Sequence, residues 1–105
     1  MMIIKESTEL KEGKLKEFIN DDFNRLFDDG TKPLIFSEDN YDVVVYQEHK
    51  NGPYQVLIEA EYYEYYKNFK TKKGAVKYAE TIINQIDKYD SATDAAIALG
   101  FNKNE

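Results

Sequence analysis

The dipeptide Asn51-Gly52, within the stretch KNGP, is the sequence feature that most constrains the fold. Asn-Gly is the pair best suited to the two-residue turn of a β-hairpin, because both residues tolerate a positive φ. Apolar and polar residues alternate on both sides of it, over residues 41–49 and 54–63. The sequence therefore predicts an antiparallel hairpin formed by these two segments.

The alternation also predicts which face of the hairpin is buried. With Asn51 and Gly52 as the loop, Val43 lies opposite Ala60 and Val45 lies opposite Ile58. The face expected to be buried carries Tyr41, Val43, Val45, Gln47, His49, Tyr54, Val56, Ile58, Ala60 and Tyr62. The opposite face carries Asp42, Val44, Tyr46, Glu48, Gln55, Leu57, Glu59 and Glu61. Turn chemistry and periodicity thus agree on one register.

Helical periodicity predicts two long helices, at residues 14–28 and 72–89. Thr71 is the expected N-cap of the second helix. The run SATD resembles a capping box and predicts a short third helix over residues 92–99, ended by Gly100.

A third strand at residues 33–38 is expected to flank the hairpin, since an isolated hairpin is marginally stable. Residues 2–5 form a candidate short strand. No repeat or linker divides the chain, so residues 1–105 are expected to form a single domain. The predicted fold class is α+β: a small antiparallel sheet packed against two long helices and a short C-terminal one.

The composition excludes several classes of function. The sequence contains no cysteine, so disulfides and thiolate metal sites are impossible, and a cytoplasmic location in a bacterial host cell is expected. It has no apolar run long enough for a membrane span and no signal-peptide pattern at MMIIKE. The net charge of −6 argues against a broad affinity for nucleic acid.

Groups for catalysis are sparse. His49 is the one histidine and stands beside the predicted turn, where a surface role is expected. The serines Ser7, Ser37 and Ser91 lie in no nucleophile motif, and the sequence DDG at residues 28–30 lacks the ligand spacing of a calcium loop. No catalytic residue, metal site or cofactor is predicted.

The stretch EAEYYEYYKNF, at residues 59–69, places tyrosines among glutamates. If the strand continues through it, Tyr62 and Tyr66 point toward the core, whereas Tyr63 and Tyr65 point outward. Tyrosine is enriched at protein interfaces, and exposed carboxylates steer a basic partner. The candidate partner-binding residues are Asp42, Tyr46, Glu48, Leu57, Glu59, Glu61, Tyr63, Glu64 and Tyr65.

A second candidate site is basic. Five lysines and no acid occur in residues 67–77, around the start of the second long helix, where free backbone N–H groups also favour anions. The candidate anion-binding residues are Lys67, Lys70, Lys72, Lys73 and Lys77. A solvated loop whose lysines balance nearby acids is the alternative interpretation.

Two motifs resemble those of DNA-binding proteins. FKTKKGAVKYA, with Phe69, Thr71, Ala75 and Ala79, resembles the F-x-T-x-x-x-A-x-x-x-A pattern of plant ethylene-response and phage integrase arm-binding domains, over residues 41–86. In those families a basic sheet face enters the major groove, whereas here that face carries acids. The resemblance therefore implies the sheet-then-helix architecture without DNA binding by the sheet.

The tail YDSATDAAIALGFNKN, residues 89–104, resembles the opening helix and turn of helix-turn-helix modules in phage and homing-endonuclease proteins. Such modules read bases with a following recognition helix, and the sequence stops before one, so direct base readout is not expected. In size, acidity and lack of catalytic groups, the chain is similar in type to phage-encoded DNA mimics and other inhibitors of CRISPR or restriction nucleases.

The function expected from these observations is a non-enzymatic interaction protein: a phage or mobile-element inhibitor, monomeric or homodimeric, that binds a basic nucleic-acid enzyme through the acidic, tyrosine-rich sheet face. One alternative is a nucleic-acid accessory protein that contacts phosphate through the lysines. Another is an uncharacterised small bacterial domain. A third is an enzyme with a pocket between sheet and helices, which no motif in the sequence supports.

Overall fold

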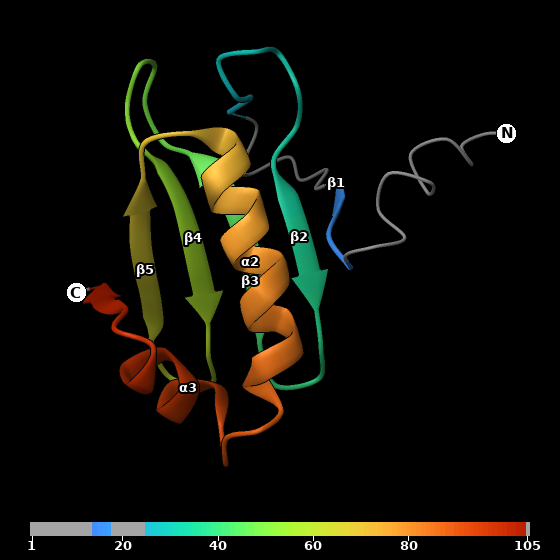
Figure 1. Ribbon diagram of the computed structural model, residues 1–105, viewed down its shortest axis with the longest axis vertical. Helices are drawn as coiled ribbons and strands as arrows, with labels where there is room; N and C mark the ends of the chain where they lie inside the picture. Colours follow the sequence, from blue (N-terminus) through green and yellow to red (C-terminus); the bar gives the residue numbers. More distant parts are fainter. Residues whose placement is uncertain (1–13, 18–24, 105) are drawn as a thin grey trace, which may run out of the picture.

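A computed structural model describes residues 14–17 and 25–104, and these form an α+β fold (Figure 1). One antiparallel sheet contains six strands in sequence order within this part of the chain. The strands are β1 (Lys16–Glu17), β2 (Leu34–Ser37), β3 (Asp42–Gln47), β4 (Tyr54–Glu59), β5 (Glu64–Phe69) and β6 (Asn102–Asn104). The third strand predicted at residues 33–38 is confirmed as β2.

Helix α2 (Lys72–Ile86) crosses one face of the sheet (Figure 1). It ends at Ile86, three residues before the predicted end at residue 89, and it buries Ala75, Ala79, Ile82, Ile83 and Ile86. These residues share a core with the inner face of the sheet, formed by Val43, Val45, Val56, Ile58 and Tyr65. As predicted, Thr71 is the N-cap, and its side chain accepts the Gly74 N–H at 3.0 Å.

The predicted short helix is confirmed as α3 (Ala92–Ala98), with Ser91 as N-cap. Gly100 follows it with a φ of 82°, a left-handed conformation that glycine adopts without strain. The chain then returns to the sheet as β6, which pairs with β5. No helix in the described ranges, residues 14–17 and 25–104, is long and apolar enough to cross a membrane.

The hairpin is present, but its register differs from the prediction by two residues. Val43 pairs with Ile58 and Val45 pairs with Val56. The loop is longer than two residues: Gly52 N–H donates to the His49 carbonyl, so Lys50 and Asn51 occupy the centre of the turn. Because the shift is an even number of residues, the predicted division of β3 and β4 into two faces survives.

The strand predicted over residues 54–63 ends early. After Glu59 the chain turns, with the Ala60 N–H donating to the Tyr63 carbonyl at 2.9 Å, and β5 begins at Glu64. This turn reverses the predicted orientation of the tyrosines that follow. Tyr62, expected in the core, is 79% exposed, whereas Tyr65, expected outside, is buried on the helix face.

The prediction of a helix over residues 14–28 is wrong for both of its described parts, residues 14–17 and 25–28. Lys16 and Glu17 form β1 and pair with β2, and residues 25–27 are not helical. Leu15 and Phe27 are nevertheless buried in the core, as their apolar character requires. Residues 18–24 and the candidate strand at residues 2–5 lie outside the described residues.

Candidate protein-binding surface

Three carboxylates line up across neighbouring strands on the sheet face opposite α2. Asp42 on β3 pairs with Glu59 on β4, and Glu59 pairs with Glu64 on β5. The row continues to β6, where the Asn104 side-chain amide donates to Glu64 Oε1 at 3.2 Å. Adjacent strands lie about 4.8 Å apart, so the three carboxyl groups occupy a strip about 10 Å long. We call Asp42, Glu59 and Glu64 the acidic row.

The acidic row shifts the titration of its central member. The pKa of Glu59 rises to about 7, first because the carboxyl group is partly buried and then because Glu64 and Asp42 stand beside it. A third negative charge at this position is disfavoured by its neighbours. The row therefore holds a proton more strongly than isolated carboxylates would, and a cation bound beside it would favour loss of that proton to solvent.

Beside the acidic row, two apolar residues on the outer face of the sheet are buried. Val44 is 3% exposed and Leu57 is 8% exposed, so Leu57 is not available as the partner contact that the sequence suggested. Tyr46 is half-buried on the same face, and its pKa rises to about 12, first by burial and then through Glu48, Glu64 and Glu59. Tyr46 thus lies within the electric field of the acidic row.

The other predicted partner-binding residues separate in the structure. Glu48 is exposed in the β3–β4 loop, and Glu61 is exposed in the β4–β5 turn. Tyr63 is half exposed, and the Lys103 Nζ lies 3.7 Å from the centre of its ring. Tyr65 is buried and leaves the surface altogether. The acidic row, Glu48 and the β4–β5 turn remain as the accessible part of the predicted site.

The lysine cluster is divided by internal contacts. Lys67 Nζ donates to the Leu99 carbonyl at 3.2 Å and lies 5.1 Å from the centre of the Tyr78 ring. Lys72 Nζ forms an ion pair with Asp29 Oδ2 at 3.0 Å. Lys70, Lys73 and Lys77 are exposed. Two of the five predicted anion-binding lysines are thus used to hold the fold together.

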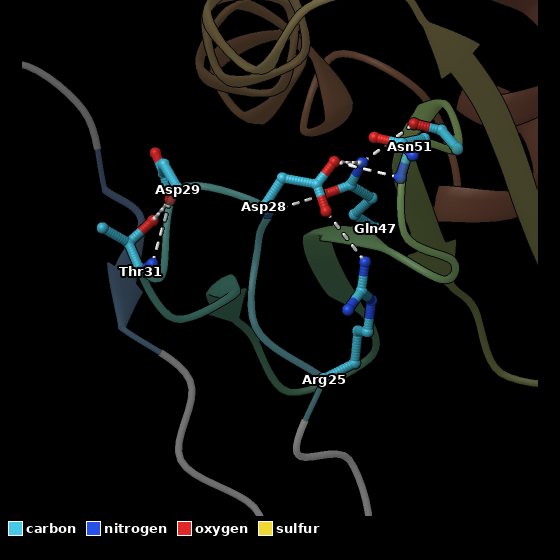
Figure 2. A network of polar contacts seen from close by, with 7 residues as sticks. Arg25, Asp28, Asp29, Thr31, Gln47 and Asn51 are labelled. Carbon is cyan, nitrogen blue, oxygen red and sulfur yellow. Dashed lines mark hydrogen bonds and ion pairs between the residues drawn. The ribbon is translucent and has the colours of Figure 1, made fainter.

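The acids at residues 28 and 29 are bound by donors of the protein itself (Figure 2). Asp28 Oδ2 accepts the Asn51 N–H and the Gln47 side-chain amide, each at 3.0 Å, and its Oδ1 pairs with Arg25. The Asn51 N–H contributes most to lowering the pKa of Asp28. Asp29 Oδ1 instead accepts hydrogen bonds from the backbone N–H and the hydroxyl group of Thr31. These contacts give both acids a structural role.

The described residues contain no metal site, and their histidine and serines lie in separate elements. No group of three or more His, Asp or Glu side chains in residues 14–17 and 25–104 has the geometry of a metal site. His49 is exposed at the β3–β4 turn as predicted, Ser37 is exposed at the end of β2, Ser91 caps α3, and Ser7 lies outside the described residues.

Sequence reasoning did not find Asn104, the β6 residue that donates to Glu64 of the acidic row. The segment NKN has no strand-like alternation or propensity, and its pairing with β5 depends on tertiary placement by α3. Comparisons with protein families, with curated proteins and with solved structures give no match to this chain.

Proposed function

We propose that this protein is a non-enzymatic interaction module that binds a basic protein through the acidic row. The observation that supports this best is the cross-strand alignment of Asp42, Glu59 and Glu64 on an ordered sheet. Sheet pairing holds these groups in place before binding, so little entropy is lost when a cationic surface meets them. Glu48 and Glu61, both exposed, extend the negative field beyond the row.

The partner that fits this chemistry is a nucleic-acid enzyme, because its phosphate-binding groove displays lysines and arginines in series. A rigid strip of carboxylates can occupy such a groove in place of a phosphate backbone. The overall net charge of −6 would assist the encounter by long-range attraction. In this role the protein would act as an inhibitor, of the kind that phages and mobile elements use against host nucleases.

The test is competition with DNA. Purified protein is titrated into complexes of fluorescein-labelled duplex DNA with each of a panel of bacterial restriction, repair and CRISPR nucleases, and DNA release is followed by anisotropy at low salt. The wild type is expected to release DNA from at least one enzyme. A variant carrying Asp42→Asn, Glu59→Gln and Glu64→Gln is expected to lose this effect by about tenfold or more.

A matched control removes the same number of charges elsewhere, through Asp39→Asn, Glu80→Gln and Asp94→Asn. If both triple variants release DNA as well as the wild type does, the acidic row is not the binding surface. If no enzyme in the panel releases DNA even at low salt, the proposed nuclease partner is wrong.

The alternative of direct phosphate binding is tested in the same apparatus. Lys70, Lys73 and Lys77 remain exposed near the start of α2, so this alternative predicts that the protein itself binds labelled DNA at low salt. Binding that disappears when these three lysines become glutamine would favour the accessory role over the inhibitor role.

A further inference from the structure

A groove of about 520 Å³ opens at the end of the sheet where the acidic row lies. Three segments form it: the loop before β3, the β4–β5 turn, and the connection from α2 to α3. Its walls include three tyrosines and three acids: Tyr41, Tyr62, Tyr89, Glu61, Asp87 and Asp90. No lysine or arginine is among the described residues that line it.

One tyrosine in the groove has a hydroxyl group without a hydrogen-bond partner among the described residues. The Tyr41 side chain is 9% exposed, and it lines the groove. Among the described residues, none forms a hydrogen bond with its hydroxyl, although its ring packs at 6.3 Å from Phe36. Burial, followed by Asp87 and Glu38, raises the pKa of Tyr41 to about 12. The hydroxyl is thus a neutral group that can accept a hydrogen bond from a ligand inside the groove.

Tyrosine faces and carboxylates together suit an organic cation. A cation gains from the negative face of an aromatic ring and from a nearby carboxylate at the same time. The chain already makes a cation–π contact outside the groove, where the Lys103 Nζ lies 3.7 Å from the centre of the Tyr63 ring. A planar guanidinium suits these walls better than an ammonium, because it can stack on a ring while donating to carboxylates at its edge.

We propose that the groove holds an arginine side chain of the partner. This inference rests on the proposed function: the β4–β5 turn that brings Glu61 and Tyr62 to the groove begins one residue after Glu59, so the groove and the acidic row lie at the same end of the sheet. The acidic row would meet the basic surface broadly, while the groove would select one arginine as an anchor. Anchoring residues of this kind carry most of the energy in protein interfaces.

The test uses two capped tripeptides, one with a central arginine and one with its neutral isostere citrulline. Each is titrated into isotopically labelled protein, and amide chemical shifts are followed by NMR. Saturable shifts at residues 60–62 and 87–93 with arginine, and none with citrulline, are expected. Tyr62→Ala is expected to weaken binding about fivefold. The double variant Asp87→Asn, Asp90→Asn is expected to weaken it more than Tyr62→Ala does. The control Asp39→Asn is expected to leave binding unchanged.

The outcomes separate this inference from the proposed function. Arginine-dependent shifts confined to Asp42, Glu59 and Glu64 would overturn the groove while leaving the acidic row as the binding surface. Equal shifts with citrulline, or tighter binding of a lysine tripeptide, would also overturn the arginine assignment. Binding in the groove without DNA release in the nuclease assay would uphold the groove and remove the inhibitor function.

Discussion

Glu59 and Glu64 stand directly opposite each other on β4 and β5, on the sheet face away from α2. Like charges in this position are destabilising, yet a third carboxylate, Asp42, faces Glu59 from β3. A sheet selected for stability would place a lysine or threonine at one of these positions. This conflict between local stability and charge is the structural reason that we propose a binding role for the row.

The first prediction concerns stability and pH. The pKa of Glu59 is about 7 in the folded protein, above its value of 4.5 in the unfolded chain. Between these two values the folded state binds more protons, so the free energy of unfolding should fall as pH rises from about 4.5 to 7 and then level off. Glu59→Gln should abolish much of this fall and stabilise the protein at about pH 8 by about 1 kcal/mol, a value reduced for partial exposure.

Urea unfolding of both proteins at about pH 5 and pH 8 measures this effect. Glu48→Gln is the matched control, because it removes one charge from the exposed β3–β4 loop. Equal pH dependence in the wild type and Glu59→Gln would show that the acidic row does not share a proton.

The second prediction concerns Gln47, which is 1% exposed on the inner face of β3. Its Oε1 accepts the Asp28 N–H at 2.9 Å, and its Nε2 donates to Asp28 Oδ2 and to the Gly52 carbonyl (Figure 2). Gln47→Ala leaves buried polar groups unpaired and opens a cavity, so it should lower the free energy of unfolding by about 2–3 kcal/mol. Chemical denaturation measures the loss.

For comparison, Gln85→Ala changes the same residue type at a partly exposed site on α2 and should change stability by less than about 0.5 kcal/mol. A Gln47→Ala variant as stable as Gln85→Ala would mean that the link between β3 and the 28–31 turn is not formed in solution.

The third prediction concerns the turn residue Asn51, whose φ is 62°. Asparagine and glycine adopt this left-handed conformation readily, whereas alanine loses about 1 kcal/mol or more. Asn51→Gly should therefore retain the melting temperature within a few degrees, and Asn51→Ala should lower it by about 5 °C. Both variants keep the backbone N–H that donates to Asp28, so the comparison isolates conformation. Equal melting temperatures would contradict the observed turn.

The same turn shows what the sequence could and could not predict. Asn51 marked the reversal of the chain, but Asp28, from a distant segment, binds its N–H and favours a longer loop. The faces of β3 and β4 and the caps of α2 and α3 were predictable because they depend on neighbours in sequence. The register of the hairpin was not predictable, because it depends on a contact between Asn51 and Asp28, which are 23 positions apart in the sequence.

The β4–β5 turn was missed for a different reason. Residues 60–63, AEYY, contain none of the glycine, proline, asparagine or aspartate residues that usually mark a reversal. The alternation therefore appeared to continue, and the tyrosines beyond it were assigned to the wrong faces. The segment before Asp28 failed similarly, since apolar spacing at Leu15 and Phe27 fits a helix although both residues reach the core from non-helical backbone. Of the candidate site, Asp42 and Glu59 followed from the hairpin, whereas the groove joins three segments that local patterns do not connect.

The last prediction separates two adjacent lysines at the start of α2. Lys72 Nζ lies 3.0 Å from Asp29 Oδ2, 2.7 Å from Thr31 Oγ1 and 4.7 Å from the centre of the Phe27 ring. Lys73 is exposed. Lys72→Ala should lower the free energy of unfolding by about 1 kcal/mol, through loss of the ion pair and the ring contact, whereas Lys73→Ala should change it by less than about 0.5 kcal/mol.

A pH titration of stability distinguishes this from a general helix effect. Thr31 and then Lys72 lower the pKa of Asp29 to about 2, against 3.8 in the unfolded chain. A lowered carboxyl pKa adds stability that is present above about pH 3.8 and is lost as pH falls toward 2. Lys72→Ala should reduce the stability that is lost on acidification, whereas Lys73→Ala should lose as much as the wild type does. If the two variants behave alike, Lys72 belongs with the exposed lysines, and the case for a phosphate-binding cluster is strengthened accordingly.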